Sequence, residues 1–187
     1  MVPFILSTKL NDYSNLKTVM SAIATPKNGK IAIAYSIWLV FFGTMTIAIS
    51  FYLRNISSLG TYKAALIVLG MYGLGCVICG IFPVDETKVM LTISAKIHGY
   101  VAVITFFMLM FIPLLMKRTL KAGGYHSFAM ISNLVFIVAF IFFVLQIASE
   151  REQFSEIFLG NTGLWQRLYL AVLYFYITIV FYFIGEF

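Results

Sequence analysis

Residues 80–99, GIFPVDETKVMLTISAKIHG, separate two long apolar runs and place charge where the chain otherwise avoids it. Asp85 follows the end of one run, and His98 stands near the beginning of the next. Only 11% of the 187 residues are charged and 61% are hydrophobic, whereas about a quarter of a soluble domain is charged. With a mean hydropathy of +0.97, most of the chain is predicted to lie in lipid, and no polar stretch is long enough for a soluble domain.

The apolar runs predict the fold class. Each is about 20 residues long, which is enough for a helix to cross a hydrocarbon core. Helices are also the only economical way to pair every backbone group inside lipid. The sequence therefore predicts an all-α, polytopic transmembrane helical bundle. Its five spans are predicted at about 31–53, 62–83, 94–116, 127–148 and 164–184, so that the membrane domain covers 31–187.

Residues 1–30 form a polar N-terminal segment with several lysines. Within it, YSNLKTVMSAIA at 13–24 has apolar residues at helical spacing: Leu16, Val19, Met20 and Ile23. This spacing predicts a short amphipathic helix at the membrane interface. A disordered tail is the alternative.

The loop charges predict how the chain is oriented. Loops 54–61 and 117–126 carry basic residues and no acid, and short basic loops usually face the cytoplasm. Asp85 and His98 then belong to the outer face of a multi-pass protein of the cell membrane. The net charge of +6 is attributed to loop lysines beside anionic lipid. No basic run is interleaved with stacking aromatic residues, so nucleic acid is excluded as a partner.

Three charged or titratable side chains are predicted at one membrane level. Asp85 leaves the second span, His98 enters the third, and Arg167 begins the last. An aspartate and a histidine suit general acid–base catalysis or metal binding, and an arginine suits a phosphate or carboxylate. Structural roles are the alternative: a loop cap for Asp85, a bond to a neighbouring helix for His98, and a membrane-surface anchor for Arg167.

Several motifs occur in an order along the chain that resembles a known family. GIFPVD is followed by a histidine that opens the next span, GLWQR opens the last span, and YSNLKTVMSAIA lies near the N-terminus. Together they resemble the uncharacterised bacterial and archaeal membrane family catalogued as domain of unknown function 998. The resemblance implies polar site positions, which fall on Ser21, Asp85, His98, Gln166 and Arg167. It also implies six spans, the first ahead of the YS-type loop; here that span is absent, and MVPFILS resembles its last turn.

The main functional hypothesis is a site at the outer face that binds a lipid headgroup or a small anionic ligand, because ionisable groups in a membrane are costly. Asp85 and His98 are its candidate catalytic residues, and Ser21, Gln166 and Arg167 its candidate ligand-binding residues. One alternative is a non-catalytic subunit or scaffold, whose partners are other membrane proteins or further copies of the chain. Another is a metal-assisted lipid hydrolase, although two histidines cannot make a three-histidine zinc site. The cofactor is unknown from the sequence, and no metal-ligating residues are predicted.

Overall fold

The computed structural model describes residues 2–56, 63–86, 90–154 and 157–184, which form helices and no strand. Five segments of this described part are long and apolar enough to cross a membrane, so the predicted all-α bundle with five spans is confirmed. The third span is divided between two helices. The long helices are α2 (Lys30–Ile56), α3 (Lys63–Ile81), α4 (Ile93–Leu109), α5 (Ile112–Ala122), α6 (His126–Ser149) and α7 (Thr162–Ile184).

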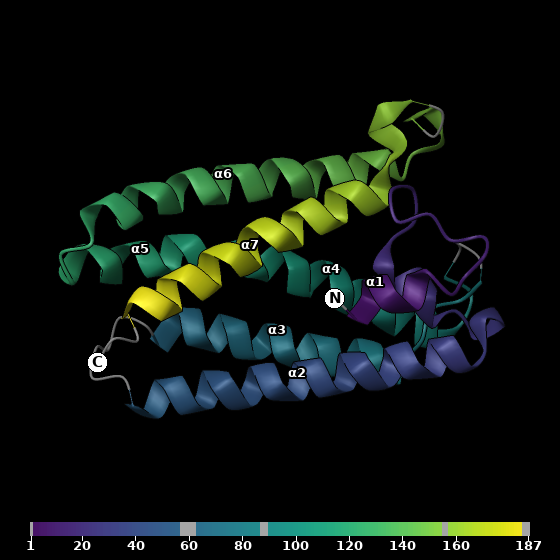
Figure 1. Cartoon of the computed structure of the whole chain (residues 1–187), viewed down its shortest axis with the longest axis horizontal. Coiled ribbons are helices and arrows are strands. Elements are labelled where there is room, and N and C mark those ends of the chain that lie inside the picture. Colours follow the sequence, from purple (N-terminus) through teal and green to yellow (C-terminus); the bar gives the residue numbers. More distant parts are fainter. Residues whose placement is uncertain (1, 57–62, 87–89, 155–156, 185–187) are drawn as a thin grey trace.

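The helices are arranged as two layers with α7 between them (Figure 1). α2 and α3 lie side by side in one layer, α5 and α6 in the other, and α7 crosses diagonally. One end of the bundle, on the right of Figure 1, gathers the N-terminal residues and the connections that follow α3 and α6. The loop 54–61 that is predicted to be cytoplasmic lies outside the described residues from position 57 on. The orientation in the membrane therefore stays a prediction.

Glycines allow α2 and α3 to pack with their backbones in contact. A Cβ atom on Gly43 would lie 2.4 Å from the carbonyl oxygen of Gly73, and one on Gly80 would lie 2.8 Å from the carbonyl oxygen of Ser36. Membrane helices associate through such close approaches because lipid gives no hydrophobic force between them. The small residues near the end of α3 therefore serve packing, as their spacing indicates.

The third span is broken in its middle, where the sequence predicts one continuous helix over 94–116. α4 ends at Leu109 and α5 begins at Ile112, with Pro113 in its first turn. Proline has no N–H to donate to the residue four positions earlier, and its ring crowds that carbonyl. Just before the break, the Phe106 carbonyl accepts a hydrogen bond from the Tyr169 hydroxyl of α7. A side chain of another helix thus bonds the backbone beside the break, as a lipid environment requires.

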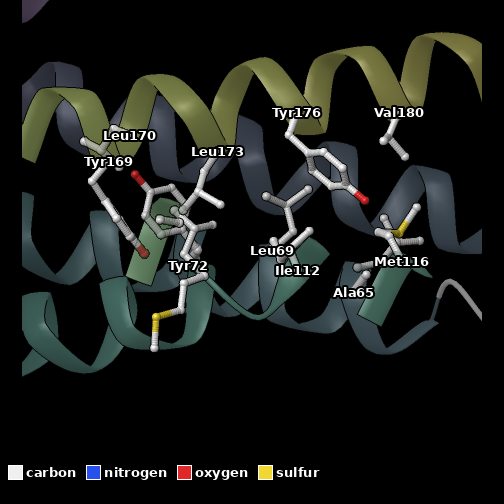
Figure 2. Packing of buried hydrophobic residues seen from close by; sticks show 14 of the residues in the cluster. Ala65, Leu69, Tyr72, Ile112, Met116, Tyr169, Leu170, Leu173, Tyr176 and Val180 are labelled. Atoms are coloured by element: carbon white, nitrogen blue, oxygen red, sulfur yellow. The ribbon is translucent and has the colours of Figure 1, made fainter. Parts of the chain in front are cut away.

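One face of α7 forms the centre of the core. Tyr169, Leu173, Tyr176 and Val180 follow helical spacing, and all four are almost completely buried. Figure 2 shows them pointing from α7 toward residues of α3 and α5. α7 therefore connects the two layers, and its first turns are fixed relative to both.

The N-terminal segment does not form the amphipathic helix that is predicted over 13–24. Its α-helix is α1 (Val2–Ser7), and residues 20–24 form the short 3-10 helix η1 (Met20–Ala24), followed by η2 (Pro26–Asn28). Residues 13–19 are turns and irregular backbone. The physical reason is that side chains of α7 bond the polar groups of this backbone, as described below. We call residues 8–29 the strap.

Candidate functional site

Arg167 fastens the strap to α7. Its guanidinium donates to the carbonyl oxygens of Asn15 (2.6 Å), Thr18 (3.1 Å) and Gly163 (2.9 Å), to the Asn15 side-chain oxygen (2.8 Å) and to the Tyr13 hydroxyl (2.9 Å). It also lies 5.9 Å from the centre of the Tyr13 ring. Burial raises the pKa of the Tyr13 phenol although the Arg167 charge opposes this. All five acceptors are neutral, so most of the guanidinium N–H groups are used in holding the strap.

The rest of the GLWQR motif serves the same junction. A Cβ atom on Gly163 would lie 2.3 Å from a carbonyl oxygen of the strap, so only glycine allows this approach. The Leu164 N–H donates to the carbonyl oxygen of Leu16 (2.8 Å), and the Gln166 side-chain oxygen accepts from the Met20 N–H (2.7 Å). The start of α7 therefore binds the strap through backbone and side chains together.

His98 is held by the end of the preceding span. Its Nδ1 lies 3.0 Å from the Cys79 carbonyl oxygen and 2.8 Å from the Phe82 carbonyl oxygen. Both are acceptors left open where α3 ends, so Nδ1 carries the hydrogen. In the neutral ring, Nε2 therefore keeps a lone pair. His98 thus caps α3 with one nitrogen, as the structural alternative predicts, and leaves the other available.

Asp85 organises the loop between α3 and α4. One carboxylate oxygen accepts from the N–H groups of Leu91 and Thr92, both at 2.9 Å, and the other accepts from the Thr92 hydroxyl at 2.6 Å. Thr92 in turn caps α4 by accepting from the Ala95 N–H. The Thr92 hydroxyl bond is the main cause that lowers the pKa of Asp85 below its usual value. Neither hydrogen bond of His98 goes to Asp85.

An interior cavity of about 490 Å³ lies between α2, α3, α4 and α7, and the N-terminal residues line one side of it. Four of the five predicted site residues line it: Ser21, His98, Gln166 and Arg167. Asp85 does not, so the structure separates it from the other four. The remaining lining residues are Pro3, Phe4, Met20, Tyr35, Trp38, Leu39, Phe42, Tyr72, Gly75, Cys76, Cys79, Ala102, Thr105, Phe106, Leu170, Ala171 and Tyr174.

Polar atoms without partners lie in this cavity wall near the strap. His98 is 3% exposed, Tyr35 5% and Gln166 6%. In the part of the chain that the structure describes, the hydrogen bonds leave His98 Nε2, the Tyr35 hydroxyl, the Gln166 amide N–H groups and the Ser21 hydroxyl without a partner. None of these atoms is among the buried unpartnered atoms of the described residues, so they reach the cavity space. This wall therefore offers hydrogen-bond donors and one acceptor, His98 Nε2, to a molecule in the cavity.

A comparison with known protein families bears on the resemblance that the sequence motifs suggested. The model of the family described as "Protein of unknown function (DUF998)" matches residues 1–182. The chain belongs to this family. The family assignment covers the strap, the cavity and nearly all of α7. No curated protein and no solved structure matched the chain.

In this DUF998 protein, sequence reasoning missed most of the cavity wall, including Tyr35, Trp38 and Thr105. Each lies inside an apolar span, where a single aromatic or hydroxyl residue is usually part of the packing. One sequence signal could have found two of them. Tyr35 and Thr105 place hydroxyl groups inside apolar spans, where polar groups are costly and often functional.

The described residues of this DUF998 protein contain no group of three or more histidine, cysteine or acidic side chains that could hold a metal ion. Cys76 and Cys79 are free and buried, and both line the cavity. The Cys79 thiol lies 3.7 Å from the His98 carbonyl oxygen, which joins α3 to α4. This contact, with the burial of both thiols, gives the pair a packing role.

Proposed function

We propose that this integral membrane protein binds a lipid or a lipid-like small molecule in its interior cavity. A volume of about 490 Å³ falls within the roughly 300–1,000 Å³ of small-molecule sites. The wall is mostly aromatic and aliphatic with a few convergent polar groups, which is the usual composition of such sites. The cavity lies between membrane-spanning helices, so its ligand arrives from the lipid phase.

The single observation that carries the proposal is the set of unpartnered polar atoms near the strap. These atoms reach the open space of the cavity, since the buried atoms without a partner in the described residues lie on Thr119 and Gln146. A ligand oxygen would accept from the Gln166 amide and the Ser21 hydroxyl, and a ligand hydroxyl would donate to His98 Nε2. The positive charge of Arg167 lies at the same end of the cavity and favours an oxygen that carries negative charge.

The scaffold alternative accounts for two other predicted site residues. Arg167 donates to five neutral acceptors of the protein, and Asp85 accepts three bonds from its own loop. Both are positioning residues in this proposal. We therefore assign no acid–base pair to Asp85 and His98, and we propose no hydrolase reaction.

The test is to fill the cavity. Ala102→Leu adds bulk to a lining position of α4, whereas Ala34→Leu adds the same atoms on an exposed position of α2 outside the cavity. Each variant is purified in mild detergent beside the wild type, and co-purifying lipids are extracted and identified by mass spectrometry. We expect one amphiphile to be enriched in the wild type and in Ala34→Leu, and to be lost from Ala102→Leu.

Added back at about 100 times its Kd, that amphiphile should stabilise the wild type by about 2.7 kcal/mol. This corresponds to about 5–10 °C in the melting midpoint. If all three proteins carry the same lipids and no added amphiphile moves the midpoint, the binding proposal is wrong and the scaffold alternative stands.

A further inference from the structure

The cavity has a second polar region far from the strap. We call Tyr72, Thr105 and Tyr174 the deep subsite. Tyr72 and Tyr174 lie near the middle of α3 and α7, and Thr105 lies in the second half of α4, so this region reaches the middle of the spans. The three residues carry hydroxyl groups and no charge. A group that binds here must therefore be soluble in the hydrocarbon core and still form hydrogen bonds.

Thr105 offers one hydroxyl to the cavity. Its side chain is 7% exposed, and within the described residues its hydroxyl has no hydrogen-bond partner. Threonines on other helices, such as Thr46, bond the carbonyl four residues earlier instead. The Thr105 side chain can lie where it does because Gly75 has no Cβ atom. Such an atom would lie 2.2 Å from the Thr105 hydroxyl oxygen.

The two tyrosines offer a second donor. Their hydroxyl groups are hydrogen-bonded to each other, so one O–H is used and the other remains. The Cys76 thiol is the other group beside Tyr72, and sulfur is a weak acceptor. A carbonyl oxygen has two lone pairs and takes two such donors. An alkyl chain in the same place would leave the Thr105 O–H unpaired and would leave the remaining tyrosine O–H with the Cys76 sulfur at best.

The rings around the deep subsite favour a flat group. Phe42 lies 6.4 Å from Tyr72, 6.0 Å from Tyr174 and 5.8 Å from Trp38 between ring centres. Trp38 also lines the cavity. Aromatic walls at these spacings make favourable edge and offset contacts with another ring.

We propose that the deep subsite binds the carbonyl end of a membrane quinone, with the ring among Trp38, Phe42, Tyr72 and Tyr174. A quinone carries a second carbonyl on the opposite side of its ring, and the amide N–H groups of Gln166 provide donors toward the strap. The ring is neutral and soluble in the bilayer, as the uncharged deep subsite requires. This inference rests on the proposed function and names its class of ligand.

The experiment uses ubiquinone-1, whose fully substituted ring does not add thiols, with the whole protein in detergent. Quinones quench tryptophan fluorescence, and Trp38 lines the cavity whereas Trp165 packs on Phe142 and Phe158 outside it. We expect saturable quenching that is largely lost in Trp38→Phe. Palmitate has a polar group but no ring carbonyls, and decylbenzene has a ring but no polar group. Both are measured in parallel by their effect on the melting midpoint of the protein.

Two near-isosteric variants test the deep subsite itself. Thr105→Val and Tyr174→Phe each remove a hydroxyl and should raise the Kd for ubiquinone-1 about fivefold or more. Thr105→Ser keeps the hydroxyl and should bind as the wild type does. Thr119→Val is the control, because the Thr119 hydroxyl is buried without a partner in the described part and lies outside the cavity, whereas the Thr105 hydroxyl reaches the cavity space.

The outcomes separate the two proposals. If ubiquinone-1 binds and only Thr105→Val and Tyr174→Phe weaken it, the inference is supported. The quinone inference is overturned if palmitate or another amphiphile binds and ubiquinone-1 does not. It is also overturned if ubiquinone-1 binds equally to all variants. In both cases the binding proposal survives. If nothing binds, both are overturned. Melting midpoints without ligand show whether each variant is folded, and Tyr174→Phe carries the test if Thr105→Val is not.

Discussion

Replacing Arg167 with glutamine should release the strap while leaving the helical bundle folded. Four of the five hydrogen bonds of Arg167 go to strap residues: Tyr13, Thr18 and, twice, Asn15. The net value of such a bond is about 0.5–1.5 kcal/mol. We take about 0.5–0.75 kcal/mol per bond, the lowest quarter of that range, because Arg167 is half-buried and the acceptors regain water once the strap lifts. The docked strap then loses about 2–3 kcal/mol.

Limited proteolysis with trypsin measures this loss, because Lys9 and Lys17 are exposed on the strap. When cleavage depends on rare local opening, its rate follows the population of the open form. A loss of about 2–3 kcal/mol therefore corresponds to cleavage roughly 30- to 150-fold faster. Arg118→Gln makes the same substitution on an exposed residue of α5 and should leave the rate unchanged.

Two results would refute the reasoning about Arg167. The first is strap cleavage in Arg167→Gln that stays within about threefold of the wild type. The second is a collapse of the whole bundle, seen as a melting midpoint so low that α4 and α5 are cleaved at their basic residues together with the strap. The first would mean that the Arg167 bonds contribute little, and the second that Arg167 stabilises the core of the bundle.

Two further predictions concern the helices and the loop. Gly43→Ala should destabilise the protein by about 1–3 kcal/mol, because its new Cβ would meet the Gly73 carbonyl oxygen at 2.4 Å. Gly70→Ala is the control and should be neutral, because its Cβ makes only ordinary contacts at 3.7 Å. Thermal unfolding in detergent compares the two variants, and equal midpoints would contradict the close approach of the helices. Asp85→Asn should lower the midpoint at neutral pH, since the lowered pKa of Asp85 means that its bonds to Thr92 stabilise the fold above the unfolded pKa of about 3.9. That difference from the wild type should vanish as pH falls through the lower folded pKa, and a difference that persists at pH 2 would show that ionisation of Asp85 is not its cause.

The spans could be predicted from the sequence because lipid imposes a strong and simple constraint on composition. The break in the third span was also within reach, since Pro113 stands in the predicted helix. What could not be predicted is which residues replace the missing backbone bonds. The hydroxyl of Tyr169 reaches the Phe106 carbonyl from 63 positions away, and such pairings depend on how the helices pack.

The candidate site was predicted in part. Ser21, His98, Gln166 and Arg167 do line one cavity. The shared membrane level suggested this for His98 and Arg167, and the family resemblance suggested it for Ser21 and Gln166. Sequence position does not tell whether a polar group faces a cavity or its own backbone. Asp85 lies at the same junction, yet its carboxylate is used by the loop. The amphipathic pattern over 13–24 was misleading for a similar reason, because α7 bonds the strap backbone and an α-helix would need those same groups.

The strap joins the first part of the chain to the last, and this sets an order of assembly. The bond from Arg167 to the Asn15 carbonyl spans 152 positions. At about 5–20 residues per second, residue 15 leaves the ribosome roughly 8–30 s before its partner. During that interval the earlier spans can enter the membrane and pair, but the strap has nothing to fasten to. The wall around the cavity is closed only by the last helix to be inserted, so a stalled or truncated chain would leave those polar groups facing lipid.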